Sequence, residues 1–191
     1  MEQERLRATI ARAQAGDPAG FEVLMDAYGS RLYGYFFRAT RNHHDAEDLL
    51  GEMMLRLVRR LKTYDHLGRF DQWLFRIAAN MVRDRIRRRK TNPVTASLSA
   101  EDDSGQSMAE QLPGPAENVD KGLLHAEMSA DLAAAMDKLD ETTRQMILLR
   151  HFGELSFKDI AETFQCPLGT ALARVHRGLK AMRRSMKPIA E

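Results

Sequence analysis

Six basic side chains fall within eight residues of this chain. Residues 83–90 carry Arg or Lys at every position except Asp84 and Ile86. Cations are favoured at the C-terminal end of a helix by its dipole, but six in eight residues exceed what that effect requires. Contact with nucleic-acid phosphates is the better explanation.

A loop that can bind a base precedes this basic segment. Residues 62–69 interrupt the helical pattern and combine Tyr64, Asp65 and His66 with Gly68. Such a loop can stack on a displaced base and hydrogen-bond its edge. Considered by itself, however, it is also an ordinary connection between two helices.

A second candidate for nucleic-acid contact lies near the C-terminus. Residues 156–159 read Ser-Phe-Lys-Asp, a capping box that starts a short helix. After a turn at residues 165–166, Pro167 starts another helix, whose apolar stripe is Leu168, Ala171, Val175 and Leu179. The opposite face is basic. This is the helix-turn-helix pattern that places a helix in the major groove; the alternative is an ordinary helical hairpin with a solvated basic face.

Other reactive side chains do not assemble into a catalytic pattern. Residues 45–48 are acidic and follow His43 and His44, but adjacent residues on a helix point in different directions, so we expect no metal site. These carboxylates suit the first turn of a helix or a docking face for a basic partner. Cys166 is alone, which excludes an internal disulfide, fits a reducing cytosol and suggests a buried turn residue. We expect no cofactor and no enzymatic activity.

The elements that must position these residues are helices. Apolar residues recur at spacings of three and four over residues 6–15, 17–36, 42–61, 70–90, 123–139, 141–151, 156–164 and 167–186. Asp17 before Pro18, and Asn42, are predicted helix caps. Trp73 is predicted to be a core aromatic. The sequence shows no convincing strand, and we predict an all-α fold.

Charge divides the chain into three parts. Residues 1–90 carry 18 Lys and Arg against 12 Asp and Glu, whereas residues 91–140 carry 2 against 10 and residues 141–191 carry 9 against 5. Residues 91–120 contain Pro, Gly, Ser and carboxylates but no Lys or Arg, as expected of a flexible linker. We therefore predict two small domains, residues 1–90 and 121–191, that face a polyanion. No segment resembles a signal peptide or a membrane span, which favours a cytoplasmic protein.

Three ordered motifs resemble the extracytoplasmic-function (ECF) sigma factors of bacterial RNA polymerase, in the sigma-70 superfamily. The first is DAEDLLGE at residues 45–52. The second is F..WLFRIAAN...DRIRR at residues 70–88, and the third is IAE...CPLGT...R.HR at residues 160–177. Together they cover both predicted domains and leave mainly the linker unmatched.

The resemblance implies a sigma factor that directs promoter-specific initiation, with a role for each group of residues. Docking on the clamp helices of the polymerase's largest subunit is implied for Asp45, Glu47, Asp48, Leu49 and Glu52. Capture of the −10 strand is implied for Tyr64, Asp65, His66, Arg69, Asn80, Arg83, Asp84, Arg85, Arg87 and Arg88. Contact with the −35 element is implied for Ser156, Thr170, Leu172, Ala173, Arg174, His176, Arg177 and Lys180. The resemblance also implies contact with the flap of the second-largest subunit, an anti-sigma partner, and a linker that threads towards the polymerase's active cleft.

Two departures and two alternatives accompany this resemblance. Gly51 stands where the family usually has Gln. Leu172 and Ala173 stand where it has Lys or Arg and then Ser, which reach DNA, so we expect −35 reading to differ here. The alternatives are a helix-turn-helix regulator that acts without polymerase, and a sigma mimic that sequesters a regulator. The intact basic run at residues 83–90 argues against the mimic.

Overall fold

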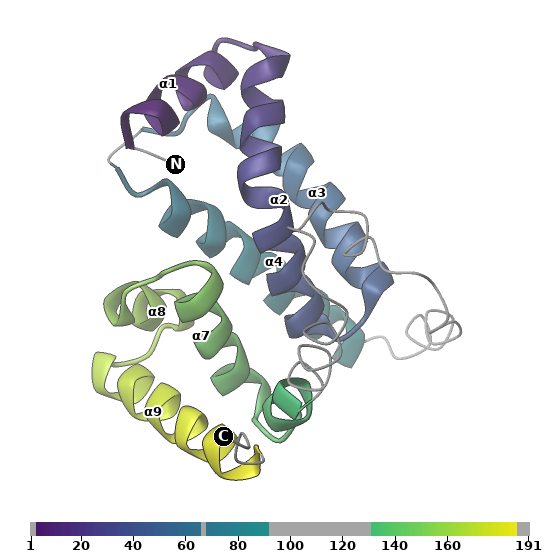
Figure 1. The fold of residues 1–191 in the computed structure, drawn as a ribbon, viewed down its shortest axis with the longest axis vertical. Helices are drawn as coiled ribbons and strands as arrows, with labels where there is room; N and C mark the ends of the chain where they lie inside the picture. Colours follow the sequence, from purple (N-terminus) through teal and green to yellow (C-terminus); the bar gives the residue numbers. More distant parts are fainter. Residues whose placement is uncertain (1–2, 66–67, 92–130, 187–191) are drawn as a thin grey trace, which may run out of the picture.

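The computed structural model describes residues 3–65, 68–91 and 131–186, and α-helices joined by short loops make up these ranges. No strand occurs within these ranges, as predicted. The helices, labelled as in Figure 1, are α1 (Gln3–Gln14), α2 (Pro18–Thr40), α3 (His43–Leu61), α4 (Phe70–Thr91), α7 (Glu141–Phe152), α8 (Phe157–Phe164) and α9 (Leu168–Ser185). Residues 131–137 form a further helical segment. Apart from Thr91, the predicted linker lies outside the described residues, as does the first part of the helix predicted over 123–139.

The N-terminal helices begin at the predicted caps. The Asp17 carboxylate accepts a hydrogen bond from the Ala19 amide at 3.0 Å, and Pro18 is the first residue of α2. The Asn42 side chain accepts one from the Asp45 amide at 2.8 Å and starts α3. Each cap satisfies an amide that would otherwise have no partner in the first helical turn. Both caps confirm the sequence prediction.

The first four helices enclose an apolar core around α2. The apolar residues at every fourth position of α3 are buried, as are most of the predicted apolar positions of α4: Leu49, Met53, Leu57, Leu61, Phe70, Leu74, Ile77, Ala78, Met81 and Val82. Val58, which the same pattern placed on the α3 stripe, is 46% exposed instead. Trp73 is only partly buried against this core. α1 lies so close to α2 that a Cβ on Gly20 would meet the Ala13 amide nitrogen at 2.7 Å. These contacts make α1–α4 one bundle.

The C-terminal helices form the predicted helix-turn-helix. Ser156 and Asp159 complete the capping box of α8, since each side chain hydrogen-bonds the backbone of the other. The C-cap of α8 is Gln165, which adopts a left-handed conformation with φ of 52°. Pro167 is the N-cap of α9 rather than its first helical residue, and the helix begins at Leu168.

The predicted apolar stripe of α9 is half wrong. Leu168 and Leu179 are each 49% exposed. The buried face consists instead of Ala171, Val175, Gly178 and Met182. The reason is the close packing of α9 on α7: a Cβ on Gly178 would lie 2.6 Å from a methyl carbon of Thr143. Gly178 therefore lies at the point of closest approach to α7. The sequence pattern had placed the next residue, Leu179, on that buried face.

We expect Ser156→Ala to lower the free energy of unfolding by about 1 kcal/mol, because α8 loses its N-cap hydrogen bonds. Thermal and denaturant unfolding measure this change. Ser30→Ala is the matched control, since Ser30 is exposed within α2 and such a change is usually within about 0.5 kcal/mol. Equal stability of both variants would contradict the capping role of Ser156.

The two groups of helices pack against each other. α7 contacts α2 and α4, and α8 contacts α4, as Figure 1 shows near the middle of the molecule. The Phe152 ring at the end of α7 lies over Arg38 and beside Gly34, where an added Cβ would come within 3.1 Å of the ring. The Arg31 guanidinium donates to the Phe152 carbonyl at 2.6 Å and to Asp71 at 2.8 Å. The buried apolar residues of both groups form one cluster.

Candidate nucleic-acid interface

An aromatic cluster supports the loop between α3 and α4. The Tyr64 ring centroid lies 4.5 Å from that of Trp73 and 5.4 Å from that of Phe70. Burial, followed by nearby carboxylates, raises the pKa of Tyr64 above its ordinary value. Both effects favour the neutral phenol, and the Tyr64 ring packs against both neighbours.

The polar residues of this loop face solvent where the structure describes them. Asp65 and Arg69 are exposed. Gly68 has a φ of 72°, a backbone conformation that glycine adopts more easily than other residues. His66 lies outside the described residues. The loop thus presents one carboxylate and one guanidinium beside the aromatic cluster.

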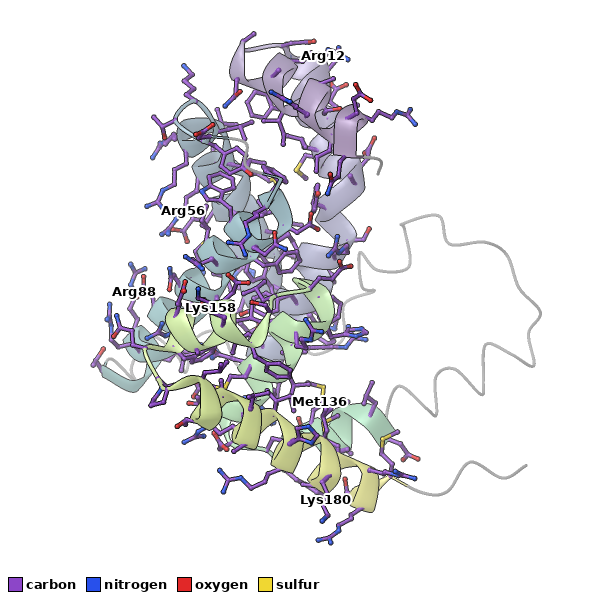
Figure 2. The ribbon with its side chains drawn as sticks, turned by 90° about the vertical axis from the view of Figure 1, so that its left-hand side faces the viewer. Arg12, Arg56, Arg88, Met136, Lys158 and Lys180 are labelled. Atoms are coloured by element: carbon purple, nitrogen blue, oxygen red, sulfur yellow. The ribbon has the colours of Figure 1, made fainter. Side chains whose placement is uncertain are left out.

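A cleft of about 790 Å³ lies between α3, α4 and the C-terminal helices. Its α4 wall carries Asn80, Arg83 and Arg87, and its α3 wall carries Arg56 and Arg60. Asn80 is exposed. Figure 2 shows that Arg56 and Arg88 project from the same side of the molecule. This side therefore combines an amide with several guanidinium groups, a set of donors suited to bases and phosphates.

Arg56 and Arg60 are members of this cleft that the sequence analysis missed. Their spacing of four residues places both on one face of α3. The spacing of Arg56 and Arg60 could have identified them as neighbours on α3. It does not show that this face of α3 is turned towards α4. Arg56 also donates to Glu52 at 2.6 Å.

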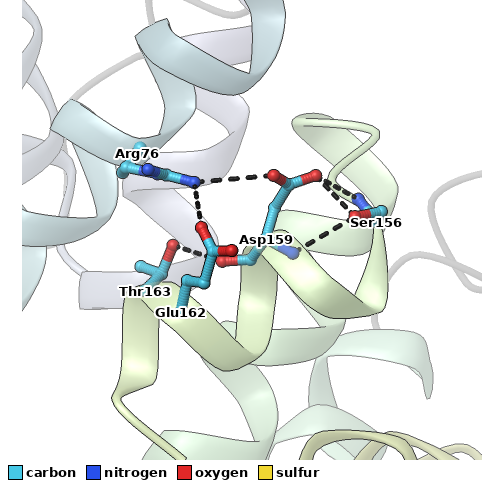
Figure 3. Close-up of polar contacts among 5 residues, drawn as sticks. All are labelled: Arg76, Ser156, Asp159, Glu162 and Thr163. Carbon is cyan, nitrogen blue, oxygen red and sulfur yellow. Dashed lines mark hydrogen bonds and ion pairs between the residues drawn. The ribbon is translucent and has the colours of Figure 1, made fainter. Parts of the chain in front are cut away.

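Two arginines of α4 bind α8 instead of facing open solvent. The Arg83 guanidinium donates to the Thr163 carbonyl at 2.7 Å and lies over the Phe164 ring. Arg76 lies 3.2 Å from Glu162 and 3.5 Å from Asp159 (Figure 3). The predicted strand-binding surface is therefore partly covered by the first helix of the helix-turn-helix.

Arg85 joins two groups of predicted site residues to each other. Its guanidinium lies 3.1 Å from Asp45 and 3.4 Å from Asp48. Arg89 also pairs with Asp45, which is only 2% exposed. Asp45 thus connects the start of α3 to the end of α4, and its carboxylate does not reach the surface in this structure.

The remaining predicted residues of the basic segment stay accessible. Arg87 and Arg88 are exposed. Arg87 lies 3.0 Å from Asp84, one turn earlier on α4. An exposed ion pair of this kind contributes little to stability, so a phosphate can replace the carboxylate as the partner of Arg87.

The predicted polymerase-docking segment has an exposed acidic face and a buried apolar one. Glu47 and Asp48 are exposed, whereas Leu49 is 1% exposed and packs in the core. Leu55 and Val58 leave an exposed apolar strip further along α3, at 62% and 46% exposure. An acidic turn followed by exposed apolar side chains is a suitable surface for a protein partner.

The outer face of α9 carries most of the predicted −35 residues. Thr170, Ala173, His176, Arg177 and Lys180 are exposed, and Leu172 is half-buried. Figure 2 shows Lys180 pointing away from the body of the molecule. Ser156 is engaged as the cap of α8. The exposed set lies along one side of the helix, which is the arrangement needed to face a DNA groove.

Arg174 departs from this face. Its guanidinium donates to Asp140 at 3.0 Å and to the Thr143 hydroxyl at 3.3 Å. Burial favours the neutral form of Asp140, but hydrogen bonds from Thr143 and Arg174 outweigh it, so the pKa of Asp140 lies below its ordinary value. In this structure Arg174 secures α9 to the cap of α7.

Both halves of the chain match known sequence families. The family described as Sigma-70 region 2 matches residues 24–91, and the family described as Sigma-70, region 4 matches residues 129–182. The chain belongs to the sigma-70 family. Within it, the chain is an ECF sigma factor, which directs promoter-specific transcription initiation and is not an enzyme.

Its relatives match it over nearly the whole chain. It is 29% identical over 184 residues to the ECF RNA polymerase sigma factor SigW of Bacillus subtilis, covering 96% of this chain and 98% of SigW. It is 28% identical to the RNA polymerase sigma-H factor of Pseudomonas aeruginosa, covering 98% of this chain and 96% of the relative. Among solved structures, the fold resembles the sigma factor RpoE in complex with the anti-sigma factor NepR from Bartonella quintana. The TM-score is 0.61 at 21% identity, with 86% of this chain and 93% of that one covered.

The family matches assign a region to most helices of this sigma factor. α3, α4 and most of α2 belong to region 2, and α7–α9 belong to region 4. α1 precedes both matches. Sigma factors bind core RNA polymerase. Among the described residues, no helix has both the length and the apolar content that crossing a bilayer requires.

Proposed function

We propose that region 2 of this sigma factor captures a displaced strand of the −10 element along α4. The observation that carries the proposal is the exposed Asn80 in a cleft lined by arginines of α3 and α4. Asn80 lies ten residues from Phe70 along one helix, or about 15 Å. The loop that begins at Tyr64 and the Asn80 amide would therefore contact different nucleotides of the same strand.

The exposed arginines would hold the backbone of that strand. Arg87 and Arg88 are accessible at once, and Arg56 and Arg60 face the same cleft. Strand binding of this kind combines a basic groove with stacking aromatic rings. Tyr64 and Trp73 supply the rings at the far end of the surface.

Full use of this surface would require the two regions to separate. One Arg83 donor is held by the Thr163 carbonyl, so the guanidinium can give all of its donors to a phosphate only after that contact breaks. We therefore propose that residues 1–90 and 121–191 act as two domains that are closed in the free protein and open on polymerase. Part of the contact that closes them consists of half-exposed ion pairs between Arg76 and α8, which exchange at little cost. The rest is the apolar packing of α7 on α2 and α4, which polymerase binding would have to replace.

Region 4 would read the −35 element with the exposed side of α9. Thr170, Ala173, Arg177 and Lys180 share that side. Ala173 and the half-buried Leu172 can touch only the methyl of thymine in the groove, whereas a bidentate side chain reads a base by hydrogen bonds. At the −35 element, this protein would therefore make more contacts with DNA phosphates than hydrogen bonds with base edges.

We expect Leu172→Arg to strengthen dependence on the −35 element about five- to tenfold, because a base contact contributes roughly 1–3 kcal/mol of discrimination. The measurement compares transcription from promoters with and without a −35 element, using core polymerase. Leu179→Arg is the control: it adds the same charge at an exposed position of α9. An equal gain from both variants would assign the effect to charge alone.

The protein partners would use different surfaces. We propose that the acidic first turn of α3 and the apolar strip formed by Leu55 and Val58 dock on the clamp of the polymerase's largest subunit, while region 4 contacts the flap of the second-largest. An anti-sigma protein is a further proposed partner, since the similar RpoE structure is a complex with one. All of these interactions would take place in the cytoplasm.

Transcription by core polymerase on a promoter library, with and without this protein, tests the proposal directly. The expected result is initiation at a restricted set of promoters that share a −10 sequence and tolerate variation at −35. Initiation that ignored the −10 sequence would overturn the assignment of the α4 surface.

A further inference from the structure

The side chain of Gln14, the last residue of α1, holds the end of α3. Its amide nitrogen donates to the Leu61 carbonyl at 3.0 Å and to the Tyr64 carbonyl at 2.7 Å. These partners are 47 and 50 residues away in sequence. Gln14 is half-buried and precedes both family matches. One amide group therefore bridges two carbonyls at the C-terminal end of α3.

These two bonds fix the turn that starts the loop. The last carbonyls of a helix have no partner within it and need a donor from elsewhere. Here the Tyr64 amide also donates to the Leu61 carbonyl, at 3.0 Å, so the backbone folds back on itself before it continues to Asp65. Gln14 clamps both ends of this 61–64 turn. The hydrogen bonds from Gln14 therefore determine the direction in which the backbone continues from Tyr64 to Asp65.

α1 is a firm base for such a clamp. Leu6, Ile10 and Ala13 are buried, and α1 packs on both α2 and α3. The close approach of Gly20 to the Ala13 backbone leaves no room for α1 to slide along α2. The position of the Gln14 amide is thus tied to the same bundle that carries Asn80.

We propose that Gln14 is a positioning residue for base selection at the −10 element. Gln14 does not touch DNA. It holds the Tyr64 backbone so that the side chains of Tyr64 and Asp65 keep a single orientation towards the displaced base. The inference rests on the proposed function of this loop. A residue with a purely structural role would change stability and leave the choice of base unaltered.

Three variants separate these roles. Gln14→Met keeps the length of the side chain and removes both donors. Gln14→Lys restores donors, because an ammonium can reach both carbonyls. Gln3→Met is the control, an exposed glutamine on the same helix. Each protein is assayed with core polymerase on promoters that carry each of the four bases at the −10 position selected by the loop.

We expect Gln14→Met to lower the preference for the best base about three- to tenfold, a part of what one base contact supplies. Gln14→Lys should retain most of the preference, and Gln3→Met should retain all of it. The preference is a ratio measured with one protein preparation, so a smaller folded fraction does not alter it. Thermal unfolding of the same preparations reports any loss of stability separately.

Two results would overturn the inference in different ways. If Asp65→Ala and Arg69→Ala change the base preference but Gln14→Met does not, the loop reads the base without help from Gln14. If none of these variants changes the preference, the proposed function of the loop fails, and the role of Gln14 fails with it. A lower melting temperature with unchanged preference would leave Gln14 a structural residue only.

Discussion

Replacing Asn80 with alanine is expected to lower open-complex formation about ten- to hundredfold while leaving the affinity for core polymerase unchanged. The amide is exposed in the α4 cleft, so its truncation should disturb little packing. A side-chain amide that reads a base contributes roughly 1–3 kcal/mol, and each 1.4 kcal/mol corresponds to a factor of ten. Permanganate footprinting of the promoter reports opening, and a fluorescence titration with core polymerase reports affinity.

Gln72→Ala is the matched control for this experiment. Gln72 is an amide residue on the same helix, half-buried near its start, and it does not line the cleft. We expect its variant to open promoters at nearly the normal rate. If Asn80→Ala weakened polymerase binding as much as promoter opening, Asn80 would be a docking residue, and the α4 surface would need another reader of the strand.

Replacing Gly34 with leucine is expected to separate the two regions and to raise the rate of promoter opening about tenfold. The new Cβ alone would lie 3.1 Å from the Phe152 ring, and the rest of the side chain would act as a wedge between α2 and α7. Overpacking of this kind disfavours a contact by about 1–3 kcal/mol. Within α2, leucine is a better helix former than glycine by roughly 1 kcal/mol, so region 2 itself should gain stability.

The separation can be measured as a distance between spin labels. Cysteines at Val23 and Ala181, both exposed, place one label on α2 and one on α9, in a Cys166→Ser background. Gly29→Ala is the control: it improves the same helix, and its nearest neighbour is 3.7 Å away. Wider label distances without faster opening would show that the Arg83–Thr163 contact does not limit strand capture.

The features that the sequence predicted well depend on neighbours in the chain. A cap needs only a short polar side chain and the amides two or three residues later, so Asp17, Asn42 and Ser156 could be identified from local spacing. The buried stripe of α3 likewise follows from its period of four. Resemblance to a family then connected these helices to a function that periodicity alone does not specify.

The features that the sequence did not predict depend on distant partners. Asp45 looked like an accessible first-turn carboxylate, yet it is buried by arginines that are 40 and 44 residues further along the chain. Arg83 and Thr163 are 80 residues apart. The outward turn of Leu179 follows from the tight contact of Gly178 with α7. In each case the local sequence does not show which distant segment packs on a residue, so its burial could not be predicted.

The contact between Arg83 and Thr163 also affects how strongly the free protein binds non-specific DNA in a cell. A genome offers about a million or more non-specific sites, and a basic groove binds them without regard to sequence. When only a fraction of a protein is competent to bind, its apparent affinity falls in proportion to that fraction. A closed chain would therefore bind bulk DNA more weakly through the α4 surface than an open one, although its exposed arginines and α9 stay accessible. The full α4 surface would be available to DNA only in the holoenzyme.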